Sequence, residues 1–184
     1  MASGFESSNN IPPTKEANSL QRLLAESAAE ELTRQLNETF HPAKTDLVAM
    51  ISRGVLVVST MAAELGVVLR VKIRAGQASA SVDEEKLRRV VNALVIHLLS
   101  VSQSAGWVTI GVEEQTAAGR RGCLLKFTAA NVVLPWKSDQ EFKEELQTQA
   151  ELSLCREIME KQGGSLEVRF QDDNQLAYSI WLPA

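Results

Sequence analysis

The chain has 184 residues, of which 45% are apolar and 23% charged, and its formal net charge is −4. This length fits one domain with a small appendage, and the composition is ordinary for a soluble globular protein. The charges are scattered without a basic stripe, which argues against nucleic-acid binding, and no apolar run reaches the length that spans a bilayer. We therefore expect a cytoplasmic protein that binds neither nucleic acid nor membrane.

The first segment, residues 1–17, is polar and contains Pro12-Pro13, so we expect it to be disordered. Residues 18–41 predict a helix, because apolar side chains recur about every fourth position. These side chains are Leu20, Leu24, Ala28, Leu32, Leu36 and Phe40. A lone helix cannot bury such a stripe by itself, so it must pack on the following domain or on a second copy. It is the element through which a homodimer would form.

Residues 44–184 predict a single domain. Asp46 can cap a helix that runs to Leu65, and Asp83 can cap a second helix that runs to about Ser102. Between them, Val67–Ile73 alternates apolar and polar residues, which predicts a strand with one face in water. The second helix is apolar nearly all round, so we expect it to be central and buried.

The second half predicts two hairpins around a helix. Strands at 107–113 and 123–128 are joined by turn residues 116–122, and a last hairpin joins 165–171 to 176–182. From Asn131 no clear period is seen until Glu144, and a helix then runs from about 145 to 162. The whole order predicts an α+β two-layer sandwich, with three helices on one face of a mixed, mainly antiparallel sheet.

Five stretches in this order resemble the GHKL ATPase family, which groups gyrase, histidine kinases and MutL, and the likeness is greatest to histidine kinases. They are HPAKTDLVAMI to ELGVVLRV, SVDEEKLRRVVNALVIHLLSVS, GCLLKFTAANVVLP, AELSLCREIMEKQGGSLEVRF and YSIWLP. The resemblance covers residues 44–184. It implies the two-layer sandwich of that family, with an ATP site between the helices and the sheet.

Taken residue by residue, the resemblance implies a degenerate site. Family members place a polar residue one helical turn before a magnesium-binding Asn; here Asn92 keeps the first position and Ile96 takes the second. Ile96 cannot ligate a hard cation that requires oxygen. The family's buried, adenine-binding Asp is replaced by Ala129, and two glycines of the same motif are replaced by Asn131 and Val133.

The second glycine-rich motif of the family cradles phosphates with backbone N–H groups at a helix N-terminus. Here the sequence at residues 147–152 is QTQAEL, without a glycine, and Glu151 would repel a triphosphate. The resemblance therefore implies no nucleotide cofactor, no metal and no catalysis. It implies a regulatory, pseudo-ATPase module whose partner is a protein, such as a response-regulator-like protein or a kinase.

Two alternatives stay open. The first is a residual nucleotide-binding domain that uses other side chains. The second is a phosphotransfer protein, which needs an accessible His. Of the two histidines, His41 precedes Pro42 and is expected in an exposed linker, whereas His97 lies inside the apolar helix and is expected to be a buried, neutral imidazole.

Five further residues complete the sequence predictions. Cys123 and Cys155 lie in apolar segments and are expected to be buried, inert thiols. Trp107 and Trp181 stand at strand ends and are expected in the core. Trp136 falls where the family has a lid, so it either packs locally, fills the vacant site or contacts a partner.

Overall fold

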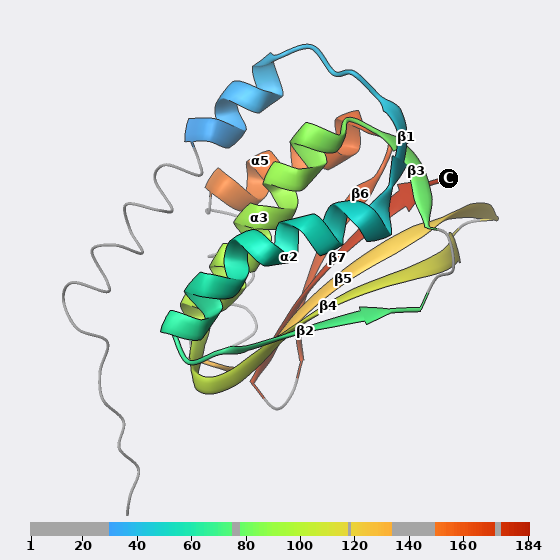
Figure 1. Ribbon diagram of the computed structural model, residues 1–184. Coiled ribbons are helices and arrows are strands. Elements are labelled where there is room, and N and C mark those ends of the chain that lie inside the picture. Colours follow the sequence, from blue (N-terminus) through green and yellow to red (C-terminus); the bar gives the residue numbers. More distant parts are fainter. Residues whose placement is uncertain (1–29, 75–77, 118, 134–149, 172–173) are drawn as a thin grey trace, which may run out of the picture.

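A five-stranded sheet forms one layer of the molecule (Figure 1). The computed structural model describes residues 30–74, 78–117, 119–133, 150–171 and 174–184. The strand order is β2-β4-β5-β7-β6. The strands are β2 (Val68–Ile73), β4 (Ser102–Ala117), β5 (Arg120–Val132), β6 (Ser165–Gln171) and β7 (Gln175–Pro183). The pair β2–β4 is parallel and the other neighbouring pairs are antiparallel. The predicted mixed, mainly antiparallel sheet is confirmed.

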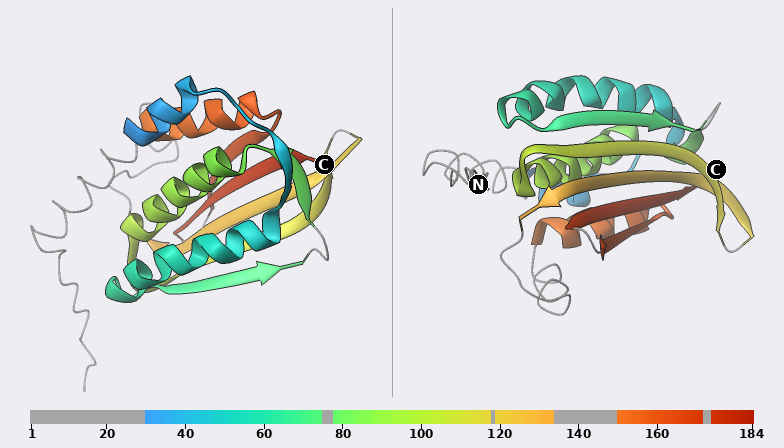
Figure 2. Two further views of the ribbon diagram at one scale, coloured as in Figure 1. Left: turned by 45° about the horizontal axis from the view of Figure 1, so that its top comes forward. Right: turned by 90° about the horizontal axis from the view of Figure 1, so that it is seen from below.

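Helices α2 (Leu47–Glu64), α3 (Glu84–Val101) and α5 (Ala150–Lys161) lie side by side across one face of this sheet (Figures 1 and 2). The first two begin where the sequence predicts, because the side chains of Asp46 and Asp83 accept hydrogen bonds from backbone N–H groups in the first turn. The predicted two-layer sandwich is therefore confirmed.

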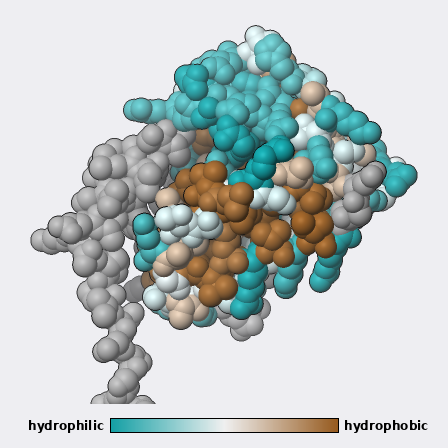
Figure 3. All heavy atoms as spheres, viewed as in Figure 1, coloured by the Kyte–Doolittle hydropathy of each residue, from teal (hydrophilic) through white to brown (hydrophobic). Residues whose placement is uncertain are grey.

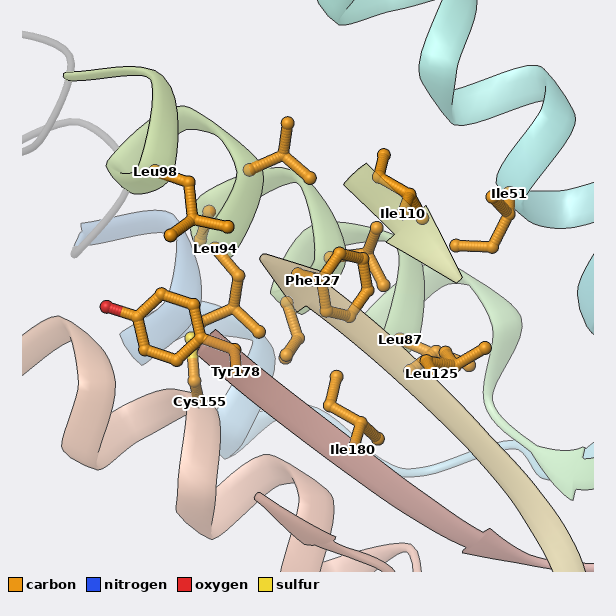
Figure 4. Close-up of a cluster of buried hydrophobic side chains, with 14 of the residues drawn as sticks. Ile51, Leu87, Leu94, Leu98, Ile110, Leu125, Phe127, Cys155, Tyr178 and Ile180 are labelled. Atoms are coloured by element: carbon orange, nitrogen blue, oxygen red, sulfur yellow. The ribbon is translucent and has the colours of Figure 1, made fainter. Parts of the chain in front are cut away.

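The core lies between α3 and the sheet. Figure 4 shows apolar side chains of α3 facing those of β4, β5 and β7. Leu94, Leu98, Phe127 and Ile180 have no accessible surface. Burying a side chain of this size is worth about 1.5–3 kcal/mol, so α3 is the element that holds the two layers together.

The described end of the N-terminal helix packs on the same domain. Residues 30–37 are helical, Leu32 is 1% exposed and Leu36 packs against the core. The ammonium of Lys86 donates to the carbonyl of Gln35 at 2.6 Å, which satisfies a carbonyl at the end of this helix. Residues 1–29 lie outside the described residues, so the disordered segment and the homodimer stay predictions.

Three sequence predictions need correction. The short strands β1 (Ala43–Asp46) and β3 (Ser79–Val82), which form an antiparallel pair of their own, were not predicted. Strand β4 runs as far as Ala117 and strand β5 begins at Arg120, so the turn between them is much shorter than the expected 116–122. Strand β2 does not have one dry face, because it lies at the edge of the sheet and leaves Val71 39% exposed.

Helix α2 has an apolar side in the core and another in solvent. Its length and composition alone would suit a membrane span. Leu47, Met50 and Ile51 are nevertheless buried against the domain, which is the position of a core helix in a globular fold. The opposite side leaves Leu56 73% and Val57 68% exposed.

Candidate functional site

The helix wall of the expected nucleotide cleft comes from α3. Asn92 and Ile96 are both part-buried and lie one turn apart, so they share a face of the helix. The amide oxygen Oδ1 of Asn92 lies against α2, 3.7 Å from where a Cβ on Gly54 would stand. Ile96 presents only carbon there and offers no oxygen to a magnesium ion.

The sheet wall is apolar where the resemblance expects a carboxylate. Ala129 on β5 pairs directly with Leu176 on β7, and neither has accessible surface. Neither side chain carries a hydrogen-bond acceptor, so an adenine amino group placed here would lose its partner from water without gaining one from these residues. The side chains at these two positions therefore offer an adenine base no hydrogen bond.

The end of β5 keeps one backbone property of the glycine-rich motif. Asn131 is exposed and has φ +58°, in the left-handed region that Gly and Asn adopt most readily. Its side chain thus replaces a glycine without forcing the chain out of that conformation. Val133 is 55% exposed, and its N–H donates to the carbonyl of Val101 at 2.9 Å. It therefore does not fill the cleft.

Glu151 lies in the first turn of α5 and is part-buried. Desolvation raises the pKa of its carboxyl from 4.5 to about 7. The carboxyl therefore carries a full negative charge only above neutral pH. The expected repulsion of a triphosphate by Glu151 is correspondingly weaker than the sequence implies, because burial favours the neutral acid.

A buried polar cluster lies beside Glu151, between α3, α5 and β7. The hydroxyl of Tyr178 is 2.7 Å from Nδ1 of His97, and the two rings meet edge to face. Burial lowers the pKa of His97 to about 4, so the imidazole is neutral, as predicted. The neighbouring Cys155, next to Tyr178 in Figure 4, is a free, fully buried thiol whose pKa is raised by burial and by Glu151.

The other histidine lies on the surface. His41 is exposed in the segment between the helical residues 30–37 and β1, as predicted. Its backbone N–H donates to the side chain of Asp83 at 2.9 Å. Its imidazole is not carried on a helix, and within the part of the chain that the structure describes no group of three His, Cys, Asp or Glu side chains is placed to hold a metal.

Of the remaining predictions, the one for the thiol of Cys123 is confirmed and the one for two tryptophans is wrong. Cys123 is buried and free, which confirms the inert thiol. Trp107 and Trp181 are not in the core: both are part-buried on the sheet face away from the helices. Trp136 and the stretch 147–149 lie outside the described residues.

This arrangement of helices and sheet is the fold of histidine kinase catalytic domains of the GHKL class. The nucleotide-free catalytic domain of the histidine kinase ThkA superposes with a TM-score of 0.66 at 15% identity, covering 78% of this chain and 95% of that domain. The histidine kinase AdeS of Acinetobacter baumannii gives a TM-score of 0.64 at 13% identity, covering 94% of this chain and 86% of the AdeS chain.

A longer form of ThkA, solved in complex with the response regulator TrrA, gives a TM-score of 0.72 at 18% identity. The match covers 90% of this chain and 48% of that kinase chain. No protein-family model and no curated protein matches the sequence. At these identities the comparisons establish the fold.

Proposed function

We propose that this chain is a non-catalytic, histidine kinase-like module that regulates cytoplasmic signalling through protein contacts. The observation that carries the proposal is the apolar pair Ala129–Leu176, fully buried where the family holds adenine with a carboxylate. Ile96 adds a second apolar position, at the place of the magnesium ligand. A nucleotide bound here would have to give up hydration of its base and its metal without replacement from these side chains.

Nucleotide titration tests this proposal. We expect no heat on titrating magnesium-ATP into the protein by calorimetry, and no shift in Tm with millimolar nucleotide. A ligand at one hundred times its Kd would stabilise the fold by about 2.7 kcal/mol, which a thermal scan detects easily. An ATP-binding kinase domain of the same fold serves as the positive control. Micromolar binding of magnesium-ATP would overturn the proposal.

The partner we propose is a response-regulator-like protein. ThkA, which shares the fold, has been solved with a response regulator. This chain also exposes an apolar surface on α2, seen in Figure 3, in which Leu56 and Val57 are the most exposed large side chains. Contiguous exposed apolar surface of this kind is typical of protein contact sites.

Binding to a panel of purified receiver domains, measured by interferometry, tests the partner. We expect at least one receiver to bind, and Leu56→Glu to weaken that binding tenfold or more, since it buries a charge in an apolar contact. Thr116→Glu, which introduces the same charge at an exposed position of β4 away from α2, is the matched control and should bind like the wild type. Equal binding by both variants would exclude α2 as the contact surface.

Phosphotransfer is the second candidate, because the imidazole of His41 is exposed and can reach a phosphorylated partner. Incubation with a phosphorylated receiver would then leave acid-labile phosphate on the chain, lost in His41→Ala. We expect no such phosphate, since His41 lies off a helix and beside the acidic Asp83.

A further inference from the structure

The open face of the five-stranded sheet, away from α2, α3 and α5, contains a depression of about 270 Å³. The strand register explains which residues meet there. Lys72 on β2 lies opposite Gly111 on β4, which in turn lies opposite Lys126 on β5. The depression is lined by these three residues together with Arg74, Trp107, Thr109 and others of the same face.

The depression concentrates positive charge on a chain whose net charge is −4. Lys72, Arg74 and Lys126 are exposed, and within the described ranges none of their side chains forms an ion pair or a hydrogen bond. The acidic residue at the rim is Glu113. Three cations facing a single carboxylate leave a net positive potential, and this potential attracts anions.

Gly111 forms the floor of the depression without being required by the fold. Its φ is not positive, and an added Cβ would meet its nearest neighbours at 3.6–3.8 Å, which is ordinary contact. A glycine in a strand interior weakens the strand, and it often marks a place where a ligand approaches the backbone. Here the missing side chain leaves space between Lys72 and Lys126.

Two further groups make the wall polar and aromatic. The hydroxyl oxygen Oγ1 of Thr109 is buried and has no hydrogen-bond partner among the described residues. An unpaired buried hydroxyl is costly, so this wall of the depression keeps an unused polar group just below its surface. The guanidinium of Arg70 lies 5.7 Å from the ring centre of Trp107, which fixes the aromatic side of the depression.

We propose that this depression binds a small polyvalent anion, through a phosphoryl or polycarboxylate group held by Lys72, Arg74 and Lys126 over Gly111. Ammonium groups hold such anions as point charges, and a guanidinium adds directed N–H donors. The volume fits the anionic part of a small molecule and is too small for a folded partner. The site lies on the opposite side of the sheet from the nucleotide cleft, so it stands independently of the proposed function.

Calorimetric titration of the full chain with inorganic pyrophosphate, and separately with citrate, tests the site. We expect saturable binding of at least one of these anions, weakened by salt. Lys126→Gln should weaken it about fivefold, as expected for one partly screened charge contact. Lys44→Gln makes the same charge change on the distant, exposed strand β1 and should leave binding unchanged.

Gly111→Ala provides a second test, because the added methyl group meets only ordinary contacts and leaves the fold intact. It should weaken binding while the Tm and the circular dichroism spectrum stay those of the wild type. Absence of saturable binding, or equal weakening by Lys126→Gln and Lys44→Gln, would overturn the proposal. Binding of a polyglutamate peptide in place of both small anions would overturn the small-molecule assignment.

Discussion

Replacing Glu151 by Gln should change how the stability of the fold depends on pH. In the folded chain burial raises the pKa of Glu151 from 4.5 to about 7, so folding favours the protonated acid. The stability of the wild type is therefore complete below pH 4.5 and is lost progressively as the pH rises through about 7. The full shift corresponds to about 3 kcal/mol. Because part of the carboxyl stays in solvent, we expect about 1–2 kcal/mol.

His97 makes the free energy of unfolding change with pH in the opposite direction. Its pKa falls from 6.5 to about 4 on folding, so the unfolded chain binds more protons between these values. Stability from this group therefore rises with pH across that window. In the wild type the two slopes oppose each other between about pH 4.5 and 6.5. Glu151→Gln removes the contribution to stability that falls as the pH rises and leaves the contribution of His97, which rises with pH.

Urea unfolding at pH 4.5 and pH 8 measures both effects. We expect Glu151→Gln to match the wild type closely at pH 4.5 and to exceed its free energy of unfolding by about 1–2 kcal/mol at pH 8. Glu160→Gln, exposed on the same helix, controls for the loss of a surface charge. If the stability difference between Glu151→Gln and the wild type were the same at both pH values, the raised pKa would be refuted.

Two other variants test the packing. Lys86→Met keeps the apolar stem but removes the ammonium that lies 2.6 Å from the carbonyl of Gln35 and 4.7 Å from the ring centre of Phe40. We expect a loss of about 1.5–3 kcal/mol and faster amide exchange confined to residues 30–37, and unchanged exchange there would contradict the docking of this helix. Gly122→Ala would place its Cβ 2.3 Å from the carbonyl oxygen of Leu182, so the Tm should fall, with a cost of about 1–3 kcal/mol. A Tm for Gly122→Ala equal to that of Gly111→Ala would show that this contact is absent in solution.

The helices were predictable because local signals mark their ends. Asp46 and Asp83 cap α2 and α3, and Gly66 and Gly163 take the left-handed conformation just beyond α2 and α5. The pair β1–β3 has only four residues in each strand, and neither strand alternates clearly. Such strands form because the chain brings them together, which no local pattern reveals.

The orientation of Trp107 could have been predicted. Val108, Ile110 and Val112 on β4 are buried, so the period of two places Trp107 on the opposite face. The aromatic character of the residue favoured the core, and this preference was wrong. Alternation along the strand was the better signal, and it leads directly to the depression on the open face.

At the candidate site, the spacing of residues in the sequence predicted which of them lie together, but not their protonation or backbone conformation. The one-turn separation of Asn92 and Ile96 on α3 was readable from the sequence. The raised pKa of Glu151 was not, because its desolvation arises from the packed fold rather than from neighbours in sequence. The left-handed backbone of Asn131 likewise depends on how β5 ends against α3.

The edge strand β2 also bears on how this protein behaves in concentrated solution. Its backbone pairs with β4 on one side, and on the other it meets no described strand. Two molecules pairing along this edge would place their β2 strands about 5 Å apart, so that Arg70 and Lys72 of one face like charges of the other when the strands are in register. That mutual repulsion discourages fibre-like stacking. Salt screens this repulsion, so the protein should associate along β2 less at low ionic strength than at high ionic strength.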